Sequence, residues 1–228
     1  MTGKLMSMRE AVDTFVPDGA SVAIGLALES AIAFAAGHEI IRRQRRRLTL
    51  IGPISDMLFD QLIGAGCAAR VVAAWVGNVS AGLGHNYRRA TESRAGAAAA
   101  LLVEDHSNFS LALALRAGAM GAPFIPTRSL LGTDLLRSNP NFRVIDDAGT
   151  PLVRVPAVVP DVAILHVQRS DDEGNAHAWG NLGVSEEAAL AARRVIVSAE
   201  EIVPAAVIHS DPNRVLTPAF KVCAVVHA

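Results

Sequence analysis

Residues 104–127 read EDHSNFSLALALRAGAMGAPFIPT, and this stretch decides the fold. An apolar run over residues 97–103 precedes it and predicts a strand that ends just before the carboxylate of Glu104. The polar turn that follows offers Ser107 or Asn108 as a helix N-cap, and the alanines and leucines after it favour a helix. Two prolines near the end of the stretch stop this helix and start an extended segment. The pattern predicts a strand, an acid-bearing loop, a helix and a glycine turn.

Glu104 has two interpretations at this point. In an open α/β sheet, ligand chemistry collects at the carboxyl ends of strands, where Glu104 would stand. Partial burial between Val103 and Phe109 would then raise the pKa of its carboxyl group toward the range useful for a base. The alternative is a solvated loop acid or an acid that caps the following helix.

The rest of the chain alternates between apolar runs and segments with helical periodicity. We expect strands over residues 21–25, 48–52, 70–76, 152–155, 162–167, 195–198 and 220–226, and helices over 7–15, 30–43, 56–63, 87–93 and 186–192. Residues 128–149 are polar and predict an irregular excursion from the sheet. This order predicts an α/β fold with an open, mostly parallel sheet and helices on both faces. Without a repeat or a linker, residues 1–228 are expected to form a single domain.

Composition excludes several classes of protein. The 228 residues are 51% hydrophobic and carry a net charge of −1, so no global charge favours nucleic acid or an anionic membrane. Residues 20–37 are apolar but contain Glu29, which favours a strand and a helix over a membrane span. Cys67 and Cys223 lack metal-ligand spacing, so we expect no metal site. Free thiols and the lack of a signal peptide predict a cytoplasmic protein.

A second candidate segment is the glycine-rich stretch over residues 77–84. It follows a predicted strand, and its glycines would let backbone amides approach an anionic or thioester ligand. Asn78 and Ser80 are its polar side chains. A tight turn that needs positive φ values would produce the same pattern. The stretch over residues 64–69 fits a loose dinucleotide fingerprint, but it follows a helix and precedes a strand, which is the wrong order for that motif.

Three blocks together resemble the α subunit of family I CoA-transferases, most closely the glutaconate CoA-transferase type. They are GNVSAGLGHNYRRATE (77–92), the stretch from EDHSNF to PFIPT (104–127), and DVAILHVQRSDDEGNAHAWG (161–180) with RRVIVSAEEIV (193–203). The resemblance runs from about residue 5 to the end of the chain. It implies an open α/β/α sheet, in agreement with the periodicity.

The resemblance also implies partners and site residues. Family members work as an α and a β chain, and the glutamate that attacks the acyl-CoA thioester belongs to the β chain. We therefore expect an α2β2 assembly that needs no cofactor, with the coenzyme A thioester as substrate. Glu104 is the expected catalytic residue on this chain. The expected substrate-binding residues follow the first four strands: Gly25, Ala27, Ser55, Asn78, Ser80 and Phe109.

Two departures from the family keep other functions open. Ile24 occupies a position where the family usually has the first glycine of a pair, and the chain stops at Ala228, where relatives continue, as a short variant or a fragment would. The first hypothesis is CoA transfer between an acyl-CoA and a carboxylic acid through a covalent thioester. The second is ring-opening hydrolysis of a cyclic acyl-CoA in steroid breakdown, with Glu104 as the base that activates water. The third is a non-catalytic subunit that binds acyl-CoA.

Overall fold

The computed structural model describes residues 3–55, 57–80, 82–92 and 101–228. Its helices are α1 (Met8–Phe15), α2 (Phe34–Arg42), α3 (Met57–Gly64), α4 (His85–Glu92), α5 (Asn108–Ala119), α6 (Leu135–Ser138), α7 (Ser185–Ala191) and α8 (Ala205–His209). Its strands are β1 (Ser21–Ala23), β2 (Leu48–Ile51), β3 (Ile54–Ser55), β4 (Ala68–Ala73), β5 (Trp75–Asn78), β6 (Gly82–Leu83), β7 (Leu102–Asp105), β8 (Phe124–Thr127), β9 (Arg143–Asp147), β10 (Thr150–Pro156), β11 (Val162–Ser170), β12 (Ala176–His177), β13 (Arg194–Ile202), β14 (Val215–Thr217) and β15 (Val222–His227).

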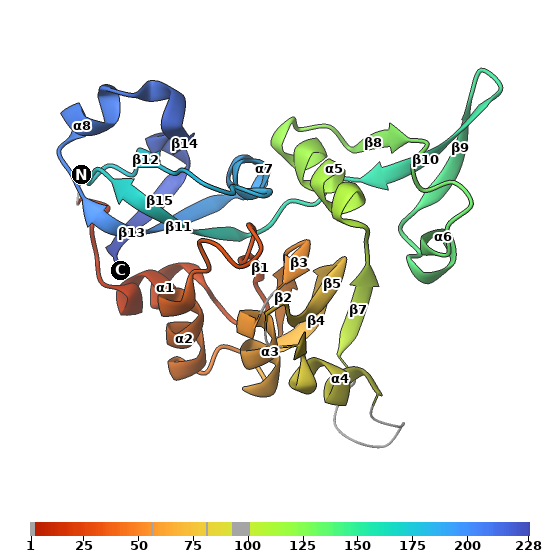
Figure 1. Ribbon diagram of the computed structural model, residues 1–228, viewed down its shortest axis with the longest axis horizontal. Helices are drawn as coiled ribbons and strands as arrows, with labels where there is room; N and C mark the ends of the chain where they lie inside the picture. Colours follow the sequence, from red (N-terminus) through yellow and green to blue (C-terminus); the bar gives the residue numbers. More distant parts are fainter. Residues whose placement is uncertain (1–2, 56, 81, 93–100) are drawn as a thin grey trace.

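A parallel sheet forms the centre of the fold, with its strands in the order β7-β4-β2-β1-β11-β13-β15 (Figure 1). The short strands β12 and β14 continue the sheet: β12 pairs antiparallel with β11, and β14 pairs antiparallel with β12. Helices α5 and α7 lie on one face, and α1, α2 and α3 lie on the other (Figure 1). The predicted fold class, an open and mostly parallel sheet with helices on both faces, is confirmed.

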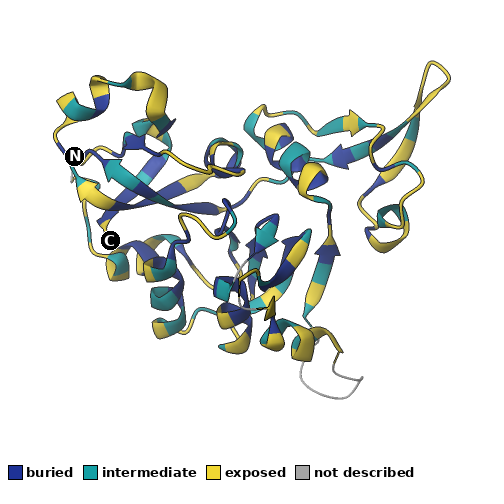
Figure 2. Ribbon diagram, viewed as in Figure 1, coloured by how far each residue is buried: buried dark blue, intermediate teal, exposed yellow. Residues whose placement is uncertain are grey.

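Each face of the sheet has its own hydrophobic core, because successive side chains of a strand point to opposite faces. In β1, Ala23 packs toward the α5 and α7 side, whereas Val22 packs toward α1 and α2. The central strands are buried along the middle of the molecule, and the helices that cover the sheet expose their outer faces (Figure 2). Small aliphatic side chains fill both cores, as the low aromatic content of the sequence indicates.

Several predicted elements differ from the structure. The helix expected to start at Ser30 starts at Phe34, because Ala31 has a φ of 54°, which lies in the left-handed region and is incompatible with a right-handed helix. The strand expected over residues 70–76 is split, because the backbone N–H groups of Ala74 and Trp75 both donate to Pro53 O (2.8 and 3.2 Å) and lead the chain out of the main sheet.

The third difference is the segment over residues 128–149, which is not irregular throughout. It contains α6 and β9, and β9 pairs antiparallel with β10 in a hairpin that projects from the sheet (Figure 1). The hairpin turn places Ala148 and Gly149 at φ values of 50° and 84°, the positive values that a tight two-residue turn requires. This excursion returns Asn139, Asn141 and Phe142 to the end of β7, next to Glu104 and His106.

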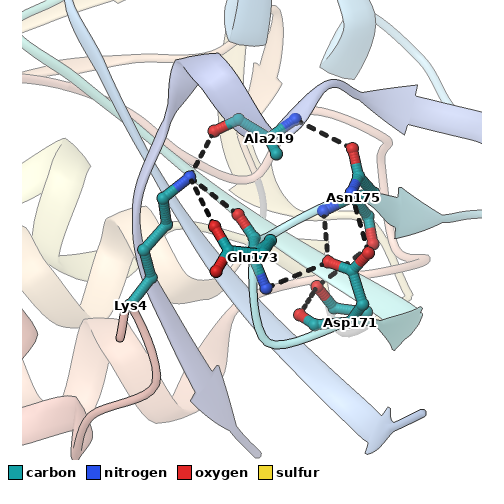
Figure 3. A network of polar contacts seen from close by, with 6 residues as sticks. Lys4, Asp171, Glu173, Asn175 and Ala219 are labelled. Atoms are coloured by element: carbon teal, nitrogen blue, oxygen red, sulfur yellow. Dashed lines mark hydrogen bonds and ion pairs between the residues drawn. The ribbon is translucent and has the colours of Figure 1, made fainter. Parts of the chain in front are cut away.

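At the opposite side of the sheet, the turn after β11 is closed by the buried carboxylate of Asp171 (Figure 3). Asp171 accepts hydrogen bonds from the backbone N–H groups of Glu173 (3.1 Å) and Asn175 (2.8 Å) and from the Asn175 side chain (2.7 Å). Lys4 Nζ donates to the carbonyl oxygens of Glu173 (2.8 Å) and Ala219 (2.7 Å), so the N-terminal segment is attached to the same turn.

Candidate active site at the carboxyl ends of the parallel strands

A groove of about 510 Å³ lies where the parallel strands end. Its walls come from the segments that follow four neighbouring strands: Leu28 after β1, Ile54 after β2, Trp75 and Val79 after β4, and His106 and Ser107 after β7. Because the carboxyl ends of parallel strands meet at one edge, side chains far apart in the sequence share this groove. The walls are mostly apolar, with the polar groups gathered at the start of α5. Such a groove suits a ligand that has an apolar portion and a few polar atoms.

Glu104 is buried beneath this edge, one residue before the end of β7. Its Oε1 lies 3.1 Å from His106 Nε2, and its Oε2 forms an ion pair with the guanidinium of Arg70. The side chain of Asn141 donates a third hydrogen bond. Strand pairing explains the ion pair: β4 and β7 are neighbours in which Arg70 aligns with Leu102, two residues before Glu104, so both side chains lie on the same face of the sheet.

These partners determine the charge of Glu104. Burial raises the pKa of its carboxyl group, but hydrogen bonds from His106 and Asn141 and the positive charge of Arg70 outweigh burial and lower the pKa to about 2. The prediction of a raised pKa is therefore wrong, because it considered the apolar neighbours and missed the three donors. Glu104 is a stable anion at neutral pH and a weak base.

His106 connects Glu104 to a hydroxyl group, an arrangement that resembles a catalytic triad. Its Nδ1 lies 3.1 Å from the Oγ of Ser110. Ser110 is fully buried, its Oγ accepts the backbone N–H of Ser107 (2.9 Å), and it donates to the carbonyl oxygen of Ser107 (3.2 Å). The hydroxyl therefore belongs to the capping box of α5, in which Ser107, one of the two predicted candidates, is the N-cap. A nucleophile must reach its substrate, so this serine is structural.

The expected residues after β1 and β2 lie at the predicted edge but are buried. Gly25 has a φ of 69°, which favours glycine, and Ala27 offers its carbonyl oxygen to Ser30 (2.9 Å) and Asn181 (3.2 Å). Ser55 is fully buried and donates to Gly52 O (2.9 Å). These residues shape the edge from below, and their predicted contacts with substrate stay predictions.

The expected residues from the later loops are more accessible. Asn78 donates to Leu83 O (3.1 Å), within a β5–β6 hairpin that replaces part of the predicted glycine-rich loop. Ser80 donates to the carboxylate of Glu29, which joins the loops after β1 and β5. Phe109 lies in the first turn of α5 with 54% of its surface exposed. Among the described residues, Val79 and Asn108 line the groove, whereas Asn78, Ser80 and Phe109 lie next to them in the sequence. The roles of these three residues in binding therefore also stay predictions.

Sequence comparison identifies the family. Residues 5–228 match the coenzyme A transferase family, which is essentially the whole chain. The chain belongs to this family. The chain is 42% identical to the A-type subunit of 3-oxoadipate CoA-transferase from Pseudomonas knackmussii, over 98% of this chain and 78% of the relative.

Solved structures show the same coenzyme A transferase fold. The crystal structure of glutaconate coenzyme A-transferase from Acidaminococcus fermentans superposes with a TM-score of 0.90 at 28% identity, covering 99% of this chain and 75% of the other. The decarboxylase AibA/AibB, in a cysteine-to-serine variant, superposes with a TM-score of 0.84 at 30% identity, covering 100% of this chain and 83% of the other. Proteins with this fold are therefore named both as transferases and as a decarboxylase.

Sequence reasoning about this coenzyme A transferase chain missed four residues of the site: Arg70, Trp75, His106 and Asn141. His106 stood inside the stretch that predicted Glu104, and its position two residues later, before the N-cap, was a usable signal. Arg70 and Asn141 gave no signal, because their contacts with Glu104 depend on strand register and on the path of the 128–149 excursion.

Within residues 3–55, 57–80, 82–92 and 101–228 of this coenzyme A transferase chain, no three histidine, cysteine or acidic side chains gather in a way that could hold a metal ion. Over the same ranges, no helix combines the length and the apolar composition needed to cross a bilayer.

Proposed function

We propose that this chain is the α subunit of a two-chain CoA-transferase, which moves CoA between an acyl-CoA and a carboxylic acid. The proposal rests on the family, on relatives named as A-type subunits, and on an apolar groove with polar groups at the edge where this fold places ligands. The relative from Pseudomonas knackmussii is named for 3-oxoadipate, so a dicarboxylic acid is the first acceptor to test.

The single observation that carries the proposal is the charge state of Glu104, whose carboxylate is held by three neighbouring side chains. A carboxyl group with a pKa of about 2 is too weak a base to take a proton from water efficiently at neutral pH. Its oxygens are also engaged by Arg70, His106 and Asn141, which would have to be released before it could attack a thioester. Glu104 therefore acts as a fixed anion, and the nucleophile belongs to the partner.

The transfer then proceeds in two exchanges at the partner's glutamate. In the first, CoA becomes a thioester of that glutamate and the acyl group leaves as a free carboxylate, which takes the glutamate oxygen. In the second, the acceptor carboxylate takes CoA by the reverse exchange and regenerates the glutamate. The covalent intermediate divides one difficult transfer into two easier steps. This chain supplies the wall of the groove from the loops after β1, β2, β4 and β7.

The partner is a β-type subunit, and the proposed assembly is α2β2 in the cytoplasm. Apolar side chains are exposed along the edge that holds the groove, including Trp75 and Phe109 at 42% and 54%. Exposed apolar side chains gathered at one edge are typical of a surface that another chain covers. Light scattering should therefore find the assembly after co-expression, and a catalytically active monomer of this chain would contradict the proposal.

The activity test uses the chain co-expressed with its β-type partner. The complex is incubated with succinyl-CoA or acetyl-CoA, with and without 3-oxoadipate or glutaconate as acceptor. We expect CoA transfer that requires an acceptor, and a CoA adduct on the partner that borohydride traps and mass spectrometry locates. Release of free CoA at the same rate without an acceptor would favour hydrolysis. Release of carbon dioxide would favour the decarboxylase chemistry named for AibA/AibB.

A further inference from the structure

His106 links the central sheet to the first turn of α5. Its ring is almost completely enclosed, and it contacts Phe142 edge-on, with ring centroids 5.1 Å apart. Its backbone N–H donates to Ala73 O (3.0 Å), which fixes the residue directly after β7. Its Nε2 bonds to Glu104 and its Nδ1 bonds to Ser110, each at 3.1 Å. Both nitrogens are therefore engaged inside the protein, and neither is free to bond to a ligand in the groove.

Ser110 passes this restraint to the wall of the groove. Its Oγ accepts from the backbone N–H of Ser107 (2.9 Å), and its own N–H donates to Ser107 Oγ (3.0 Å). Ser107 and the next residue, Asn108, line the groove together with His106. A continuous series of hydrogen bonds thus runs from Glu104 through His106 and Ser110 to the groove wall.

Each hydrogen bond in this series has a donor and an acceptor whether or not Nδ1 of the imidazole carries a proton. The carboxylate of Glu104 accepts only, so Nε2 carries a proton. If Nδ1 is unprotonated, it accepts the hydroxyl hydrogen of Ser110. If Nδ1 is protonated, Ser110 Oγ accepts from it and donates to Ser107 O, which lies 3.2 Å away. The connection between β7 and α5 therefore does not depend on which of these forms is present.

We propose that His106 is a positioning residue of this site: it anchors the first turn of α5 to the buried Glu104 and so fixes the Ser107–Asn108 wall against which the acyl-CoA binds. The substrate in this statement rests on the proposed function, whereas the positioning of α5 does not. Small displacements of groups that orient a substrate reduce turnover severely, so the expected effect is on catalysis as well as on local order.

Three substitutions of His106 separate its two bonds. His106→Gln places an amide near the position of Nε2, so it can bond to Glu104 but not to Ser110. His106→Asn places its amide near the position of Nδ1, so it can bond to Ser110 but not to Glu104. His106→Phe keeps the aromatic contact with Phe142 and loses both bonds. The matched control is His209→Gln, because His209 is exposed on α8 and remote from the groove.

Two measurements on the co-expressed complex test the proposal. We expect His106→Phe to lower kcat/KM by about tenfold to a hundredfold. We also expect it to increase deuterium uptake in the peptide that covers residues 107–111. His106→Gln and His106→Asn should each recover part of both effects, because each restores one bond. If His106→Phe does not fold, the Gln and Asn variants must still show intermediate losses relative to His209→Gln.

The results distinguish the two proposals. If the wild-type complex transfers CoA and all His106 variants match His209→Gln in kcat/KM and in deuterium uptake, the positioning role is wrong. If activity falls while deuterium uptake over residues 107–111 stays at the control value, His106 acts on the substrate directly and the proposal is also overturned. If the wild type shows no transfer with any donor and acceptor, the proposed function fails, and deuterium uptake alone decides the role of His106.

Discussion

Two of the buried carboxylates in the described residues, Asp171 and Glu104, are held in opposite ways. Asp171 is satisfied by its own turn, since its donors are the backbone of Glu173 and the backbone and side chain of Asn175 (Figure 3). Glu104 is satisfied by side chains from three distant places: Arg70 on β4, His106 before α5 and Asn141 before β9.

The difference separates a structural carboxylate from one that organises a site. Backbone donors within one turn fix only that turn, so Asp171 stabilises the connection between β11 and β12. Side-chain donors from separate elements are fixed relative to one another by the acid they share, so Glu104 joins β4, the start of α5 and the excursion after β8. Only the second arrangement controls the geometry of the groove, which lies between these elements.

The largest expected effect is the loss of stability in Asp171→Ala. The substitution removes the buried carboxylate and leaves two backbone N–H groups and the Asn175 amide of a part-buried turn without their acceptor, which costs about 3–5 kcal/mol in the free energy of unfolding. Urea unfolding of the variant measures this loss. Asp171→Asn keeps one acceptor oxygen and should lose less. In the complex that still folds, kcat/KM should stay near the wild-type value, and a specific loss of activity would contradict the comparison.

Glu104→Gln should lose less stability than Asp171→Ala, and its loss should depend on pH. The folded-state pKa of about 2 lies below the ordinary value of 4.5, so the charged form stabilises the fold by about 3 kcal/mol. This contribution is fully present above the unfolded-state pKa and is lost as pH falls from 4.5 through about 2.

Urea midpoints of wild type and Glu104→Gln across this pH range measure the difference. We expect the two proteins to differ most at neutral pH and to converge in acid. A difference that stays constant throughout would show that the charge of Glu104 is not what its neighbours stabilise.

Much of the fold could be predicted because it depends on residues that are close together in the sequence. The helix expected over residues 7–15 begins at a capping box of Ser7 and Glu10, and the helix expected after Ser107 or Asn108 begins at the N-cap Ser107; both starts depend on neighbours in sequence, and both helices are confirmed. Boundaries failed where long-range contacts decide them. The chain leaves β4 at Ala74 because Pro53 offers an acceptor, and this contact has no local signal.

The site could be predicted in position but not in electrostatics. The rule that ligand sites lie at the carboxyl ends of strands placed Glu104 near the end of its strand, and the structure has it there, at the edge that carries the groove. The pKa of its carboxyl group was predicted in the wrong direction, because Arg70 and Asn141 reach it through strand register and through a folded excursion. Asp171 shows the contrast, since every donor it uses lies within four residues in the sequence.

The smallest expected effect is that of Phe109→Ala on stability. This variant tests whether the first turn of α5, which the Glu104 cluster holds in place, contributes to the groove. Phe109 follows Asn108 in the first turn that Glu104 and His106 hold in place, but more than half of its own surface is exposed. Its truncation should therefore change the free energy of unfolding by less than about 0.5 kcal/mol, as is usual for exposed positions.

If this first turn forms the acyl-CoA wall, Phe109→Ala should still raise KM for the acyl-CoA by about threefold to tenfold, the loss expected for one apolar contact with a ligand. Phe220→Ala is the matched control, because Phe220 is 82% exposed and lies outside the groove. Thermal unfolding and steady-state kinetics of both variants in the complex measure the two effects. Equal KM values for the two variants would remove Phe109 from the substrate-binding residues and confine the role of the first turn to Ser107 and Asn108.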